Sequence, residues 1–141
     1  MKRKNFIASI LVGTTSGSLL ASCAEGKKEE EKPSTESKTG FIVHNVYFWL
    51  KEGITAEEEK EFLKFIEILK TIPGIHEYQI GKPSATTPRP VVDNSFSYYW
   101  MATFKNMEDI ETYEKHPDHI AAAEAYSKYW TKVEVKDATL L

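Results

Sequence analysis

Residues 41–141 predict an α+β fold, in which helices cover one face of an antiparallel sheet. Three observations support this class. Segments rich in aromatic and β-branched residues are interspersed with segments of helical periodicity, Pro and Gly separate them, and the strand-like segments carry apolar side chains on both faces. Residues 1–40 differ in composition and are expected to lie outside this domain.

A strand at residues 41–50 opens the domain and a helix follows it. The strand sequence Phe-Ile-Val-His-Asn-Val-Tyr-Phe-Trp-Leu contains no residue that breaks a strand. Thr55 and Glu58 have the spacing of a capping box, and the helix is predicted to run to about residue 72, where a Pro-Gly pair ends it. Its core face follows the i, i+3, i+4, i+7 pattern and consists of Phe62, Phe65, Ile66 and Leu69.

Two further strands and a short helix come next. The strands are predicted at residues 75–80 and 96–104, on either side of a polar, proline-marked loop at about 81–94. Asn106 is a favoured N-cap type, and a helix is expected from it through Lys115.

Pro117 divides the second helical region in two. Asp118 is expected to cap the helix that follows, which is predicted to run to about Trp130. The last strand is predicted at residues 131–138. The resulting order, β-α-β-β-α-β, predicts the ferredoxin-like arrangement.

Neither face of the predicted sheet is polar. Side chains alternate between the two faces of a strand, so one apolar set meets the helices and the other faces away from them. The set that faces away contains Tyr47, Trp49, Tyr99 and Met101. Because a monomer rarely exposes so large an apolar patch, we expect this face to pack against a second copy in a two-fold dimer.

The charge of the domain disfavours nucleic acid as a partner. Residues 41–141 contain 11 Lys plus Arg against 16 Asp plus Glu, a net charge of −5 with neutral His. No basic stripe interleaves with the aromatic residues. The sequence has no glycine-rich phosphate loop and no nucleophile elbow, and its body contains no Cys, so we expect neither a cofactor nor a metal.

The N-terminus has the pattern of an export signal. A basic start, Lys2-Arg3-Lys4, precedes a mostly apolar stretch at residues 6–20, which is too short and too polar for a membrane span. The stretch ends in Leu20-Ala-Ser-Cys23, which resembles the lipobox of bacterial lipoproteins, where cleavage precedes the Cys and the Cys is acylated by fatty acids such as palmitate. Ordinary cleavage after Ser22 is the alternative.

The lipobox resemblance implies a membrane location. Residues 1–22 are predicted to be the signal peptide, and residues 23–40 to be the acylated Cys23 with a disordered tether, because this segment is rich in Glu, Lys, Ser and Thr. The domain would then be exported and lipid-anchored to a bacterial cell membrane, on its periplasmic side or at the cell surface.

The segment Tyr113-Glu-Lys-His-Pro-Asp-His119 concentrates polar aromatic residues at the helix junction. His119 is either a general base or a residue that ties the junction together. Tyr113 is either a hydrogen-bond donor to a carbonyl or a core aromatic whose hydroxyl is hydrogen-bonded within the protein. In the second case His119 is a candidate partner for the hydroxyl. His116 is expected to be structural, and a zinc site with His119 is disfavoured because no third ligand is evident.

His44 interrupts an otherwise apolar strand face. A buried polar group is costly unless it is hydrogen-bonded, so a ligand, a water or His119 is expected to satisfy it. Several aromatic residues could line an apolar ligand pocket beside it, although core packing is their default role. These residues are Phe48, Phe62, Tyr98, Trp100, Tyr126 and Trp130.

The chain from about residue 41 to its end resembles the stress-responsive α/β-barrel, or Dabb, domain family. The resemblance rests on Val43-His44, the Ile72-Pro73-Gly74 turn, Gly81, Phe104, the Tyr113-x-x-His116-Pro117-x-His119 signature, Trp130 and Val135-x-Asp137. It implies a dimer in which two sheets pack face to face as a barrel.

The family resemblance also implies a site. In a plant polyketide cyclase of this family, the motif Tyr and the last motif His are the acid/base pair, which correspond to Tyr113 and His119 here. The first-strand pocket His corresponds to His44, whereas Tyr98 replaces a second pocket His. The chain is thus predicted to bind a small, largely apolar molecule, with cofactor-free cyclase-, isomerase- or lyase-like chemistry as one outcome and a non-enzymatic stress-related binding module or scaffold as the other.

Overall fold

The computed structural model describes residues 37–141 of the 141-residue chain. The predicted signal peptide, Cys23 and most of the predicted tether lie outside the described residues. Within residues 37–141, no helix is both long enough and apolar enough to cross a membrane.

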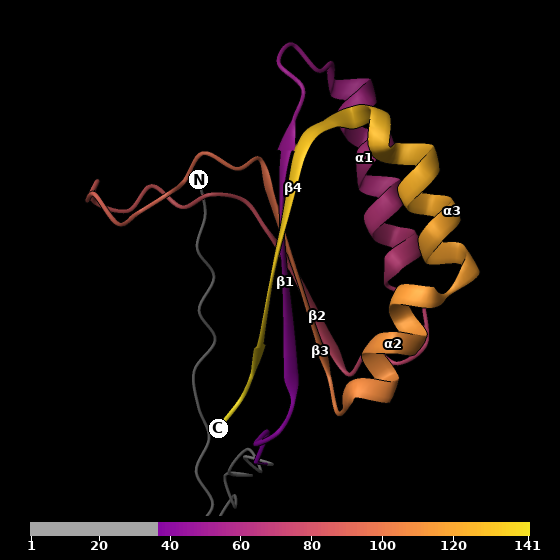
Figure 1. Cartoon of the computed structure of the whole chain (residues 1–141). Coiled ribbons are helices and arrows are strands. Elements are labelled where there is room, and N and C mark those ends of the chain that lie inside the picture. The colour runs from indigo at the N-terminus through magenta and orange to yellow at the C-terminus, as the bar shows by residue number, and fades with distance from the viewer. Residues whose placement is uncertain (1–36) are drawn as a thin grey trace, which may run out of the picture. The chain divides into compact units, whose positions relative to one another are not determined.

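Four strands and three α-helices follow the predicted order and confirm the α+β, ferredoxin-like fold. The elements are β1 (Ile42–Leu50), α1 (Ala56–Leu69), β2 (Glu77–Gly81), β3 (Tyr98–Phe104), α2 (Met107–Lys115), α3 (Pro117–Tyr126), the short 3₁₀ helix η1 (Ser127–Tyr129) and β4 (Trp130–Thr139). The sheet order is β2-β3-β1-β4, and every neighbouring pair is antiparallel. All three α-helices lie on one side of the sheet, and the loop between β2 and β3 projects toward the other side (Figure 1).

Helix α1 forms as the sequence predicts. The Thr55 side chain accepts a hydrogen bond from the Glu58 backbone N–H, and the Glu58 carboxylate accepts one from the Thr55 N–H, which completes the capping box. The four predicted core residues of this helix are all buried. Burial of this apolar face against the sheet is the main contribution of α1 to stability.

The turn after α1 requires glycine at position 74. Gly74 has φ of 98°, in the left-handed region, and a Cβ built on it would lie 2.6 Å from the backbone oxygen of Asp109. The close approach packs this turn against the first residues of α2. Gly74 therefore sets the distance between the end of α1 and the start of α2.

The α2–α3 junction differs from the prediction in its cap. His116, not Asp118, is the N-cap of α3: its extended backbone is the conformation preferred before Pro117, and its Nδ1 accepts a hydrogen bond from the Asp118 N–H at 3.2 Å. Pro117 then occupies the first position of the helix, where a missing N–H is tolerated. The predicted structural role of His116 is confirmed, and its physical basis is this cap.

Helix α3 also ends earlier than predicted. It stops at Tyr126, and Trp130 is the first residue of β4 rather than the end of the helix. The Trp130 ring lies 5.4 Å from the ring of Phe48 and 5.3 Å from that of Phe65. Packing of this large ring between β1 and α1 overrides the helical propensity of the preceding residues.

The core lies between the sheet and the helices. Val46 and Phe48 of β1 and Trp100 of β3 point into it, and each is at most 6% exposed. The predicted inward face of β1 is thereby confirmed.

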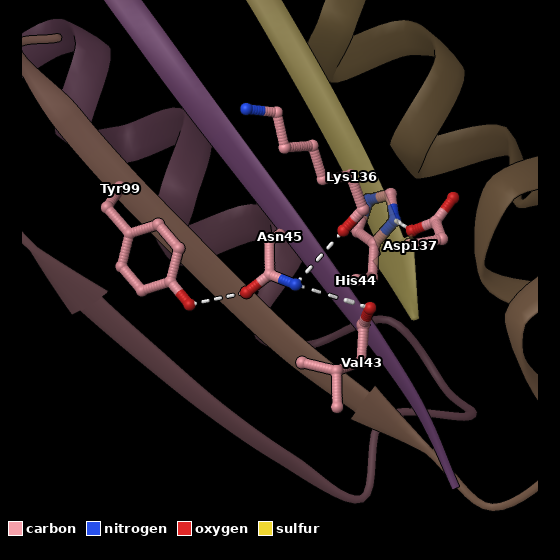
Figure 2. A network of polar contacts seen from close by, with 6 residues as sticks. All are labelled: Val43, His44, Asn45, Tyr99, Lys136 and Asp137. Carbon is pink, nitrogen blue, oxygen red and sulfur yellow. Dashed lines mark hydrogen bonds and ion pairs between the residues drawn. The ribbon is translucent and has the colours of Figure 1, made fainter. Parts of the chain in front are cut away.

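The outer face of the sheet is more polar than predicted, because β4 contributes charged side chains to it. The Lys132 ammonium lies 4.0 Å from the centre of the Trp49 ring, and Glu134 forms ion pairs of 2.9 Å with Lys132 and Lys136. Figure 2 shows Asn45 at the centre of a network on this face: its Oδ1 accepts from the Tyr99 hydroxyl at 2.6 Å, and its Nδ2 donates to a β4 carbonyl.

Candidate functional site

A pocket of about 470 Å³ lies between the sheet and the helices. Its volume is within the range of small-molecule sites, about 300–1,000 Å³. Strands β1, β3 and β4 contribute one wall, and α1, α2 and α3 contribute the rest. The pocket brings together all three predicted acid/base residues, which are His44, Tyr113 and His119.

His44 is held in place by a carboxyl group from the edge strand. It is 6% exposed, and its Nδ1 lies 2.7 Å from Oδ1 of Asp137, the residue directly opposite it in the β1–β4 register (Figure 2). An imidazole whose Nδ1–H donates to a carboxyl oxygen presents Nε2 as the free nitrogen. Asp137, and not the expected His119, is the side chain that engages Nδ1.

Asp137 is the site residue that sequence reasoning missed. The Val135-x-Asp137 pattern in the last strand was the available signal, but only the strand register shows that Asp137 faces His44. Ninety-three positions separate the two residues in the chain.

Tyr113 is almost completely buried, at 1% exposure. Burial raises the pKa of its hydroxyl, so the phenol stays protonated at neutral pH. The Trp100 indole N–H approaches this hydroxyl and lowers its pKa by a smaller amount, although the Trp100 Nε1 itself meets no partner within hydrogen-bond geometry. Among the described residues no hydrogen bond joins the two groups, so the Tyr113 hydroxyl keeps a proton available for donation in the pocket.

His119 meets Tyr113 ring to ring rather than through a hydrogen bond. The two ring centres are 4.7 Å apart in an edge-to-face arrangement. Burial lowers the pKa of His119, and the neighbouring His44 and His116 lower it further. The imidazole is therefore neutral at neutral pH and able to accept a proton.

The predicted pocket aromatics divide into two groups. Phe48, Trp100 and Trp130 line the pocket. Phe62, Tyr98 and Tyr126 do not, for reasons of packing. Phe62 is fully buried behind the pocket wall, and Tyr98 turns toward α1, where its hydroxyl donates to Glu59 at 2.5 Å.

Tyr126 packs its ring on Phe65 and lines a separate groove between α1 and α3. The alanines of α3 leave room as the sequence suggested, since Ala123 is a wall residue of the main pocket. The remaining apolar lining was not predicted and consists of Val46, Phe65, Leu69, Val133 and Val135.

Among residues 37–141, no three His, Cys, Asp or Glu side chains gather at metal-binding distance. His116 uses its Nδ1 to cap α3. The chemistry that this arrangement offers is a neutral imidazole and a protonated phenol, edge to face, in a mostly apolar pocket. That pair can accept one proton and donate another.

Comparison with known proteins agrees with this architecture. The sequence model of the stress responsive A/B barrel domain (Dabb) family matches residues 42–140. The chain belongs to the Dabb family. A curated relative, olivetolic acid cyclase from Cannabis sativa, is 24% identical over 99 residues, which are 70% of this chain and 95% of the cyclase.

Several solved structures share the fold. A Dabb protein with a ferredoxin-like fold from Mesorhizobium loti has a TM-score of 0.60 at 27% identity and covers 73% of this chain and 99% of its own. A dimeric ferredoxin-like protein of unknown function from Thermobifida fusca has a TM-score of 0.59 at 17% identity, covering 75% and 96%. Hydroxynitrile lyase from Passiflora edulis has a TM-score of 0.58 at 16% identity, covering 72% and 94%.

Proposed function

We propose that the domain binds a small, largely apolar molecule between sheet and helices and performs cofactor-free acid/base chemistry beside a carbonyl group. One observation carries the proposal: His44, Tyr113 and His119 come from three different elements and share one pocket of about 470 Å³. Relatives of this family with named activities are a cyclase and a lyase, which supports the same class of reaction.

In the proposed reaction His119 is the general base. Its neutral imidazole removes a proton from the carbon next to the carbonyl, while the Tyr113 hydroxyl donates a hydrogen bond to the carbonyl oxygen. His44, oriented by Asp137, supports the bound carbonyl compound from β1. The apolar wall excludes water and strengthens these contacts.

Exchange of carbon-bound hydrogen for deuterium tests this proposal without knowledge of the natural substrate. We expect the purified chain to accelerate exchange at the α-carbons of 4-(2-naphthyl)butan-2-one in D₂O, followed by NMR. His119→Ala should reduce the protein-dependent rate by about 10²-fold or more. The melting temperature of this variant should remain close to that of the wild type.

His116→Ala is the matched control. It removes a His of the same motif that caps α3 and lies outside the pocket lining, so it should lower stability by about 1 kcal/mol and reduce the exchange rate far less than His119→Ala does. Equal loss of exchange in both variants would contradict the assigned roles.

Binding without chemistry is the second candidate function. It is favoured by the burial of Tyr113, which packs on Phe104 with ring centres 5.2 Å apart, as a structural corner would. Ligand binding that His119→Ala leaves intact, with no exchange in the wild type, would support this binding module. Unfolding of His119→Ala with no effect on any ligand would support a scaffold.

We propose that two copies associate through the outer sheet face. Tyr47, Trp49, Tyr99 and Met101 all lie on it, half-buried within a single chain. Related structures described as dimeric support this arrangement. Sedimentation equilibrium at micromolar concentration should give twice the chain mass for the wild type and one chain mass for Tyr47→Glu. Ile120→Glu, at an exposed position of α3 on the helix side of the sheet, should remain dimeric.

We further propose that Cys23 is acylated and tethers the domain to the outside of a bacterial cell membrane. The basis is the Leu20-Ala-Ser-Cys23 sequence after a basic and then apolar start. Metabolic labelling with a palmitate analogue should mark the wild type and not Cys23→Ser. Equal labelling of the two would contradict the anchor.

A further inference from the structure

Among residues 37–141, those that line the pocket include no Lys or Arg, and the one formally charged residue among them is Glu114. Glu114 is exposed on α2 and forms no ion pair with another described residue. Asp137 adds a second carboxyl group directly behind His44. The acidic groups at this pocket therefore have no basic counterpart on its wall.

Two lysines adjacent in sequence to pocket residues form ion pairs elsewhere. Lys136 of β4 points to the outer face of the sheet, where it pairs with Glu134 at 2.9 Å. Lys115 of α2 pairs with Glu111 at 2.8 Å, one turn back along the helix. Neither lines the pocket.

His119 does not supply the missing positive charge, because burial lowers its pKa and keeps it neutral at neutral pH. Nδ1 of His44 is already engaged by a carboxyl oxygen. An anionic ligand would thus lose its hydration without gaining a Lys or Arg partner, and it would face the carboxylate of Glu114.

We propose that the pocket selects ligands whose polar end is uncharged, such as ketones and amides, and rejects carboxylates and phosphates of the same shape. This inference rests on the proposed function, because it names the substrate class of that same pocket. The phenol of Tyr113 suits a neutral carbonyl oxygen as acceptor. The apolar end of such a ligand would lie against the aromatic wall formed by Phe48, Trp100 and Trp130.

Three near-isosteric molecules test the selectivity by calorimetric titration of the purified full chain at pH 7.5. They are 4-(2-naphthyl)butan-2-one, 3-(2-naphthyl)propanamide and 3-(2-naphthyl)propanoate, which differ only in the group attached to the carbonyl carbon. We expect the ketone and the amide to bind about tenfold or more tightly than the carboxylate, because an unpaired buried charge is strongly unfavourable.

Charge reversal at Glu114 connects the selectivity to the pocket. Glu114→Lys should bring the carboxylate to within about threefold of the ketone, because it supplies the absent cation at the pocket wall. Glu124→Lys is the matched control: Glu124 is exposed on α3, forms no ion pair with the described residues and does not line the pocket. It makes the same change in net charge and should leave the tenfold preference intact.

The outcomes separate this inference from the proposed function. A carboxylate that binds the wild type as tightly as the ketone overturns the inference, while deuterium exchange on the ketone would leave the proposed function standing. If Glu114→Lys and Glu124→Lys change the preference for the ketone over the carboxylate equally, the assignment of that preference to this pocket is overturned. Failure of all three molecules to bind overturns both proposals.

Discussion

Removal of the Asp137 carboxyl group should destabilise the domain although that side chain lies largely in solvent. In Asp137→Ala, the Nδ1 of His44 loses its partner while the imidazole stays buried, with a side chain only 7% exposed. A buried polar group left without its hydrogen bond costs about 1–3 kcal/mol. The Asp137 side chain is 48% exposed, so water weakens the lost contact, and we expect a loss of about 1–2 kcal/mol.

Urea denaturation followed by circular dichroism measures this loss. For a domain of this size, each kcal/mol corresponds to a shift of about 4–8 °C in melting temperature, which provides a second readout. Asp137→Asn keeps an oxygen acceptor at the same position and should cost about 0.5 kcal/mol or less. Thr139→Ala removes an exposed side chain from the same strand and should stay within about 0.5 kcal/mol of the wild type.

Two results would refute the reasoning. An Asp137→Ala protein as stable as Thr139→Ala would show that water satisfies His44 once the carboxyl group is gone. Equal losses in Asp137→Ala and Asp137→Asn would show that the hydrogen bond to Nδ1 is not the stabilising contact.

Four further predictions concern the turn, the titration of two site residues and the aromatic core. Gly74→Ala should cost about 2 kcal/mol or more in urea denaturation, because φ is 98° and the new Cβ would lie 2.6 Å from the Asp109 oxygen. Gly53→Ala is the control: Gly53 has φ of 71° but open space around it, so the substitution should cost about 1 kcal/mol. Equal losses in the two variants would contradict the steric argument. The folded-state pKa of His119 lies below its unfolded value, so the free energy of unfolding should fall as pH drops below about 6.5. Urea denaturation measured between pH 5 and 8 should show a weaker pH dependence in His119→Gln than in the wild type. An unchanged pH dependence would exclude His119 as the cause of this loss of stability. The folded-state pKa of Tyr113 is raised, so its contribution is complete below about pH 10 and is lost as pH rises further, and Tyr113→Phe should remove this alkaline loss. Phe62→Ala should cost about 3–5 kcal/mol of stability by calorimetry, because its ring is fully buried. The preference of the pocket for the ketone over the carboxylate should not change, because Phe62 lies outside the lining. A change in that preference would place Phe62 in the site.

Local signals predicted most of the fold. The capping box at Thr55, the spacing of the α1 core residues and the Pro-Gly turn are interactions between near neighbours in sequence, and each is present in the structure. The α2–α3 junction shows the limit of such signals. Asp118 and His116 both satisfy the sequence rule for a polar residue near Pro117, and the backbone conformation before the proline selects His116.

The sequence singled out the three candidate acid/base residues but not the contacts that they make. His44, Tyr113 and His119 share a pocket, yet Tyr113 and His119 meet as rings rather than through the expected hydrogen bond. Half of the predicted aromatic lining belongs to other parts of the core, because periodicity shows that Phe62 and Tyr98 face inward without showing which neighbours they meet.

The sequence by itself determined the order of the elements, the inward face of each and the identity of the polar aromatic residues at the helix junction, since these depend on propensity and on periodicity along one chain. Tertiary structure alone decided that Asp137 holds His44, that Trp130 begins a strand rather than ending a helix, and that the pocket wall lacks a basic side chain. Each of these depends on which strand pairs with which and in what register. A register is a property of two distant segments together, and neither segment encodes it alone.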